Sequence, residues 1–147
     1  MIKIEIDLGI SFETAEAEVA ESRKPVTPGD YTVQVTNITP GQSGSESKTP
    51  GRPYLNWELT VVGHSEFTGK KVWMITSLPW ADASNGNRLL TSGINFLVDI
   101  TKALGQPWQG GKLRTEEYHG RTCKATIGLE INKRSGEPRN TIDKVYA

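Results

Sequence analysis

The ten residues 53–62 (PYLNWELTVV) constrain the fold of this chain more than any other segment. Leu55, Trp57, Leu59 and Val61 occupy alternate positions and form a continuously apolar set. Because the side chains of a strand point to its two faces in turn, this alternation predicts a strand with one face in the core. The same pattern predicts Trp57 as a core residue rather than a surface ring.

Further segments show the strand pattern. They are residues 30–38, 70–78, 121–132 and 139–146. In segment 70–78 both faces are partly apolar, so periodicity leaves open whether Trp73 points inward. Residues 133–138 (KRSGEP) predict a hairpin turn in which Gly136 supplies a positive φ.

Residues 88–104 have the periodicity of a helix, whereas residues 40–52 have no regular apolar pattern. In residues 88–104 apolar residues recur at spacings of three and four, which predicts the one good helix, and Gly105 follows it. Residues 115–118 could form a single helical turn. Residues 40–52 are dominated by Gly, Ser and Pro without an apolar anchor, which predicts a long mobile loop.

The predicted order is three strands, one helix and a two-stranded hairpin. This is the element order of a five-stranded OB-fold barrel with a helix between strands 3 and 4. The sequence therefore predicts a mainly β, OB-fold-like domain over residues 25–147, and prolines and Gly29 mark its start. Such barrels commonly bind oligonucleotides across their second and third strands.

Residues 1–24 form a separate acidic leader, predicted as a short strand over residues 2–8 followed by a marginal helix or tether over 14–22. Residues 1–21 carry six acidic side chains against Lys3, a net charge of −5. Residues 22–147 carry sixteen basic and eleven acidic side chains, a net charge of +5. This separation indicates an anionic partner.

Composition excludes several classes of protein. One cysteine and two histidines cannot supply an intramolecular disulfide or a four-ligand zinc site, so neither a metal nor another cofactor is expected. The longest apolar run is far short of the roughly 20 residues of a membrane span. Residues 1–7 alternate charged and apolar side chains, unlike a signal peptide. The expected compartment is a reducing cytoplasm.

The sequence offers no catalytic constellation. It contains no HExxH, P-loop or GxSxG motif, and the adjacent Glu116 and Glu117 cannot converge on one point. Cys123 lies in line with Ala125 and Ile127, which favours a core thiol over a nucleophile. We therefore expect a binding protein rather than an enzyme.

Single-stranded nucleic acid requires cations for its phosphates and flat side chains for its bases, and both are present. Tyr54 faces away from the apolar set of its strand, and Trp73 is the second candidate for stacking. The candidate cations are Arg52, Lys70, Lys71, Lys124, Lys133, Arg134 and Arg139.

Two runs, 51–59 (GRPYLNWEL) and 67–73 (FTGKKVW), resemble a family of small phage-encoded single-stranded DNA-binding proteins with a Gly-Arg-Pro-Tyr-Leu-Asn strand motif. Shorter matches at 29–31, 103–105 and 138–140 extend the resemblance over residues 28–147. It implies an OB-type fold and single-stranded DNA binding during phage DNA replication or recombination, in the cytoplasm of the host cell. By position it points to Arg52, Tyr54, Asn56, Lys70, Lys71 and Trp73.

The acidic leader is a departure from many cellular single-strand binders, which carry their acidic segment at the other end of the chain. We hypothesise that residues 12–22 compete for the basic surface or recruit replication or recombination proteins. An alternative is an OB-type protein-interaction or assembly module without nucleic-acid binding. Exposed strand edges would also permit a homo-oligomer by strand addition.

Overall fold

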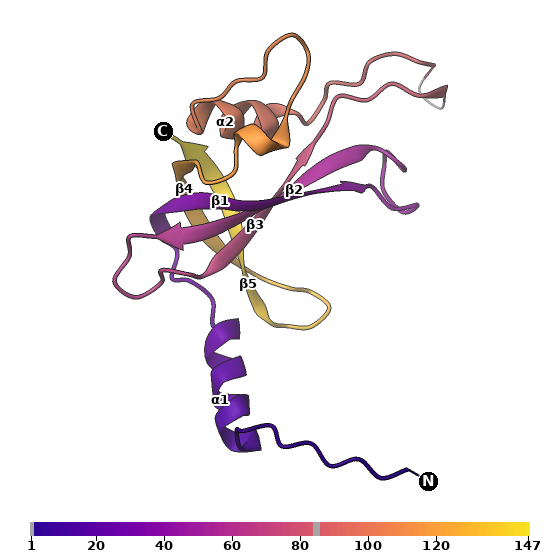
Figure 1. Cartoon of the computed structure of the whole chain (residues 1–147). Coiled ribbons are helices and arrows are strands. Elements are labelled where there is room, and N and C mark those ends of the chain that lie inside the picture. The colour runs from indigo at the N-terminus through magenta and orange to yellow at the C-terminus, as the bar shows by residue number, and fades with distance from the viewer. Residues whose placement is uncertain (1, 84–85) are drawn as a thin grey trace.

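A computed structural model describes residues 2–83 and 86–147, and it is mainly β (Figure 1). The elements are α1 (Phe12–Arg23), β1 (Gly29–Gln42), β2 (Pro53–Val62), β3 (Lys71–Ser77), α2 (Asn95–Ala103), the 3₁₀ helix η2 (Thr115–Glu117), β4 (Thr122–Ile131) and β5 (Pro138–Tyr146). The five strands form one antiparallel sheet in the order β3-β2-β1-β4-β5. Within the described ranges no helix has both the length and the apolar character needed to cross a bilayer.

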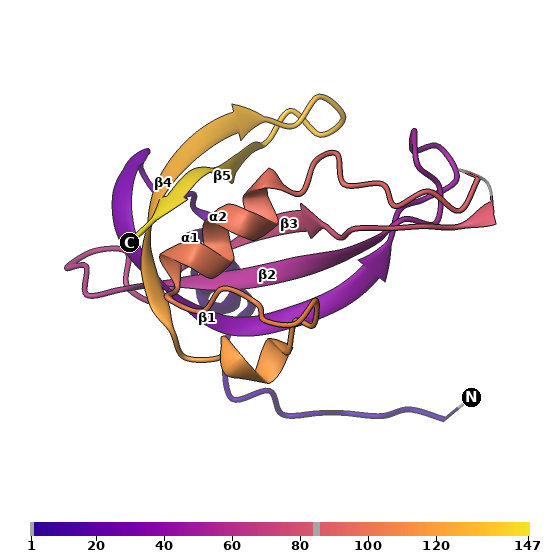
Figure 2. The same cartoon turned by 90° about the horizontal axis from the view of Figure 1, so that it is seen from above.

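The sheet curls but remains open, so it does not form the predicted five-stranded barrel (Figure 2). β3 and β5 stand at the two ends of the strand order, although some of their Cα atoms come within 8 Å of each other. The segment before β1 takes up part of the edge of β5. There the Asn140 amide accepts from the Val26 N–H at 2.8 Å and donates to the Val26 carbonyl at 2.8 Å.

β1 is longer than the predicted 30–38 because it pairs with two strands over different parts of its length. Its first residues, 29–34, pair with β4, and residues 32–42 pair with β2. A bulge between Val35 and Asn37, just past the last residue paired with β4, bends the strand. Pro40, which can donate no hydrogen bond, is tolerated because it lies where β1 pairs only with β2.

The core confirms the interpretation of segment 53–62, whose predicted bounds coincide with β2. Trp57 is fully buried, its Nε1 donates to the Thr76 Oγ1 at 2.8 Å, and Tyr118 packs edge-on against its ring. Val72 and Met74 are buried with Thr76 on the same face of β3. This settles the orientation that periodicity left open, because Trp73 must then point to solvent.

α2 differs from the sequence prediction in extent, and α1 covers residues 14–22, for which the sequence left a marginal helix or a tether open. The predicted helix 88–104 begins only at Asn95, because Leu90 forms an antiparallel bridge with Trp80 and Gly93 has φ of +77°. A second helix, α1, precedes the sheet, and the Ser11 Oγ caps it by accepting from the Thr14 N–H at 3.2 Å. Residues 2–8, predicted as a strand, have no regular secondary structure and pair with no strand of the described chain.

Cys123 is buried, as its position among apolar residues predicts, and burial raises the pKa of its thiol from 9.0 to about 11. The folded state therefore holds this proton more tightly than the unfolded chain. We expect the free energy of unfolding to lose a contribution as pH rises from about 9 to about 11, and none of that contribution below pH 9. Urea titrations of the wild type and Cys123→Ala should show the steeper loss in the wild type. Parallel pH profiles would contradict it.

Candidate nucleic-acid interface

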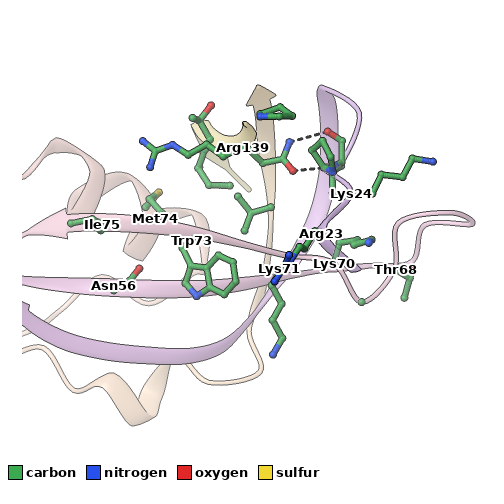
Figure 3. Close-up of a pocket in the computed structure, with 18 of the residues that line it drawn as sticks. Arg23, Lys24, Asn56, Thr68, Lys70, Lys71, Trp73, Met74, Ile75 and Arg139 are labelled. Carbon is green, nitrogen blue, oxygen red and sulfur yellow. Dashed lines mark hydrogen bonds between the residues drawn. The ribbon is translucent and has the colours of Figure 1, made fainter. Parts of the chain in front are cut away.

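A groove of about 1020 Å³ is lined by the edge of β3, by β5 and by the segment that follows α1 (Figure 3). Five basic side chains line it, and none of the described residues in its lining is acidic. We call it the cationic groove. Its basic residues are Arg23, Lys24, Lys70, Lys71 and Arg139.

Three parts of the chain bring these cations together. Arg23 ends α1 and Lys24 follows it, Lys70 and Lys71 stand at the start of β3, and Arg139 is on β5. The Lys70 Nζ donates to the carbonyl of Glu21 at 2.6 Å, which joins the last turn of the helix to the strand. A cation at this position is also favoured by the partial negative charge of a helix C-terminus.

Arg23 and Lys24 are the basic groove residues that sequence reasoning missed. They belong to residues 1–24, which the predicted domain division assigned to the acidic leader, although the charge count ended its acidic part at residue 21. A signal is nevertheless present, because the run of glutamates stops abruptly at two adjacent basic residues before Pro25. This change of charge sign beside the predicted domain boundary separates Arg23 and Lys24 from the acidic residues before them.

Exposed apolar side chains line the wall of the groove beside these cations. Trp73 and Ile75 lie on the outer side of β3, and Phe96 comes from α2. Trp73 is 54% exposed, far more than a ring of its size in a core. Figure 3 shows its indole standing off β3 next to Lys71.

Glu58 positions one of the groove cations. It lies opposite Trp73 on β2, and its carboxylate accepts from the Thr36 Oγ1 at 2.7 Å and pairs with the Lys71 Nζ at 3.3 Å. The Thr36 hydrogen bond, together with Lys71, lowers the pKa of Glu58 below its usual value. Glu58 is therefore ionised at neutral pH and holds the Lys71 ammonium beside the exposed indole.

Arg139 is held in a similar way, since its guanidinium pairs with the Glu130 carboxylate at 2.5 Å. Asn56, opposite Ile75 on β2, adds a polar group to the groove wall. Its Oδ1 is buried without a hydrogen-bond partner among the described atoms. An unpaired buried acceptor of this kind costs about 1–3 kcal/mol, so an N–H donor that reached it would be favoured.

The structure places Arg52 elsewhere, which corrects its assignment as a phosphate contact. Arg52 is only 5% exposed and lies outside the groove. Its Nε donates to the carbonyl of Leu78 at 3.0 Å, and its Nη2 donates to the carbonyl of Ser92 at 2.6 Å. Arg52 thus ties the end of β3 to the segment before α2, and this contact is structural.

Four other predicted residues are also outside the groove. Tyr54 is half-buried with its ring against Gly41, where an added Cβ would come within 2.6 Å of the ring. Since Tyr54 lies four residues before Glu58 on β2, it is about 13 Å along the strands from Trp73. Exposed Lys124 is on β4, and exposed Lys133 and Arg134 are in the β4–β5 turn.

The groove therefore unites half of the predicted set. Its members are Asn56, Lys70, Lys71, Trp73 and Arg139. Among residues 2–83 and 86–147, no group of three or more His, Cys, Asp or Glu side chains could hold a metal ion. Comparison with known proteins finds no family model and no curated protein that matches this chain.

Proposed function

We propose that this protein binds single-stranded DNA in the cationic groove, without sequence preference and without catalysing a reaction. One observation carries the proposal: five basic side chains and an exposed indole line one groove, and the described lining holds no carboxylate. Phosphates would pair with the ammonium and guanidinium groups. A base would stack on Trp73.

The arrangement of the strands supports the proposal. An OB fold is a five-stranded, partly open barrel that uses its second and third strands to bind oligonucleotides. Here β2 and β3 supply Asn56, Lys71 and Trp73, and the open edge of the sheet lies at β3. We accordingly propose an OB-like fold. The family resemblance suggests a role in phage DNA replication or recombination in the host cytoplasm.

A fluorescence titration with oligo(dT) tests the proposal directly. Trp73 is the tryptophan that lines the groove, and its indole is exposed. A base stacked on it should therefore quench its emission. Duplex DNA of equal length should bind more weakly, because its bases are already stacked on each other. No quenching and no gel shift at low salt would contradict the proposal and favour a protein-interaction module.

The salt dependence should report how many groove cations meet phosphates. Each contact to a single strand contributes about −0.7 to the slope of log K against log salt. Lys71 and Arg139 already pair with carboxylates, and the other three cations form no ion pair among the described residues. We therefore expect a slope between about −2 and about −3.5, measured by anisotropy at several NaCl concentrations.

Matched variants test whether the phosphate contacts that produce this slope are made in the groove. Lys70→Gln removes one groove cation and should flatten the slope by about 0.7. Lys133→Gln/Arg134→Gln removes two exposed cations that lie outside the groove, and it should leave the slope unchanged. Equal slopes for the wild type and Lys70→Gln would argue against this placement of the phosphates.

The acidic leader should compete with DNA for the groove. Residues 1–22 carry a net charge of −5, and the Glu21 carbonyl already holds the Lys70 ammonium. Deleting residues 1–22 keeps Arg23 and Lys24 in the chain and should tighten DNA binding several-fold at low salt. The gain should shrink at high salt, because screening weakens the competition. Unchanged affinity at low salt would remove the idea.

A further inference from the structure

Residues 2–10 form an unusual segment of exposed aliphatic side chains. Five of them occupy alternate positions, and they are between 41% and 87% exposed. They are Ile2, Ile4, Ile6, Leu8 and Ile10. The positions between them include Lys3, Glu5 and Asp7, so an extended chain here has one apolar and one mainly acidic face.

α1 holds this segment away from the groove of its own molecule. The helix has 12 residues and is about 18 Å long, and its C-terminal end is anchored at the groove through Lys70. Residues 2–10 continue from the opposite end of the helix, far from the sheet (Figure 1). A second molecule can present its groove to this segment without any rearrangement of α1.

The groove is chemically complementary to the segment. β3 is an end strand of the sheet, so one side of its backbone offers hydrogen bonds to an added strand. Trp73, Ile75 and Phe96 provide an apolar wall for the aliphatic face. The five groove cations provide partners for Glu5 and Asp7.

We propose that residues 2–10 of one copy bind along β3 in the cationic groove of a second copy, which makes the protein a homo-oligomer in solution. The occupant is identified by its charge, which is opposite to that of the groove, and by its alternating aliphatic face. The proposal does not depend on DNA binding. It concerns the protein freed of nucleic acid.

Sedimentation of the full chain over a wide concentration range tests this assembly. We expect a concentration-dependent mass above that of the monomer. Ile4→Ser/Ile6→Ser should raise the dissociation constant about a hundredfold or more, because two apolar anchors are lost. The matched control is Leu129→Ser/Ile131→Ser, which changes two exposed aliphatic residues outside both the leader and the groove and should not alter the mass.

A charge variant tests the contact between the acidic side chains of the segment and the groove cations. Glu5→Lys/Asp7→Lys should weaken the oligomer at low salt far more than at high salt. A full chain that stays monomeric at every concentration would overturn the proposal, and so would an oligomer that Ile4→Ser/Ile6→Ser leaves intact. Because every sample is nuclease-treated and free of DNA, either result leaves the proposed DNA binding to its own titration.

Discussion

Replacing Trp73 with alanine is expected to weaken binding of oligo(dT) by about 5- to 150-fold, which corresponds to the loss of one stacked base. The indole is 54% exposed and lies in the wall of the cationic groove, beside the Lys71 ammonium. Its removal takes away the stacking surface and leaves the cations in place. Anisotropy of a labelled oligonucleotide at fixed salt measures the change.

Two variants make this result specific to a stacked ring. Trp73→Phe keeps an aromatic face and should recover most of the affinity. Ile131→Ala removes a side chain that is similarly exposed but lies outside the groove, and it should bind DNA as the wild type does. Wild-type affinity in Trp73→Ala would refute stacking at this residue.

Replacing Trp57 with alanine should affect stability instead, lowering the free energy of unfolding by about 3–5 kcal/mol. Its indole is completely buried, and its removal leaves a large cavity against Tyr118. It also deprives the buried Thr76 Oγ1 of the Nε1 donor at 2.8 Å. Urea unfolding followed by circular dichroism gives the difference.

Trp57→Phe separates the cavity from the hydrogen bond. It keeps much of the ring volume and loses the donor, so a smaller loss of about 1–3 kcal/mol is expected. The folded fraction should bind oligo(dT) normally, because Trp57 is sealed from the groove. A loss below about 1 kcal/mol in Trp57→Ala would contradict its place at the centre of the core.

Local alternation predicts the strands of this protein well. The bounds of β2 coincide with the apolar alternation of segment 53–62, and Cys123 is buried with Ala125 as that pattern indicates. The same reasoning fails in the second half of β4, where Leu129 and Ile131 are exposed although they continue the buried face. Beyond Ile127, which is still buried, β4 no longer pairs with β1 and is joined to β5 alone, so this end of the strand extends past the core, which a fixed period of two cannot anticipate.

The groove was harder to predict because it depends on contacts between distant segments. Arg52 and Tyr54 are two residues apart, and their adjacency suggested a common surface. In the structure Arg52 binds two backbone carbonyls instead. Conversely, Arg23 and Lys71 are far apart in sequence, and they meet because the last turn of α1 lies against the start of β3.

The open edge between β3 and β5 has a mechanical consequence. Elsewhere in the sheet, separating two neighbouring strands requires breaking a ladder of backbone hydrogen bonds. At this edge the opposing strands face each other through side chains, so moving them apart disrupts packing while every ladder stays intact. This edge can therefore widen without breaking a ladder, and the proposed DNA binding would use that freedom to admit purines as well as pyrimidines.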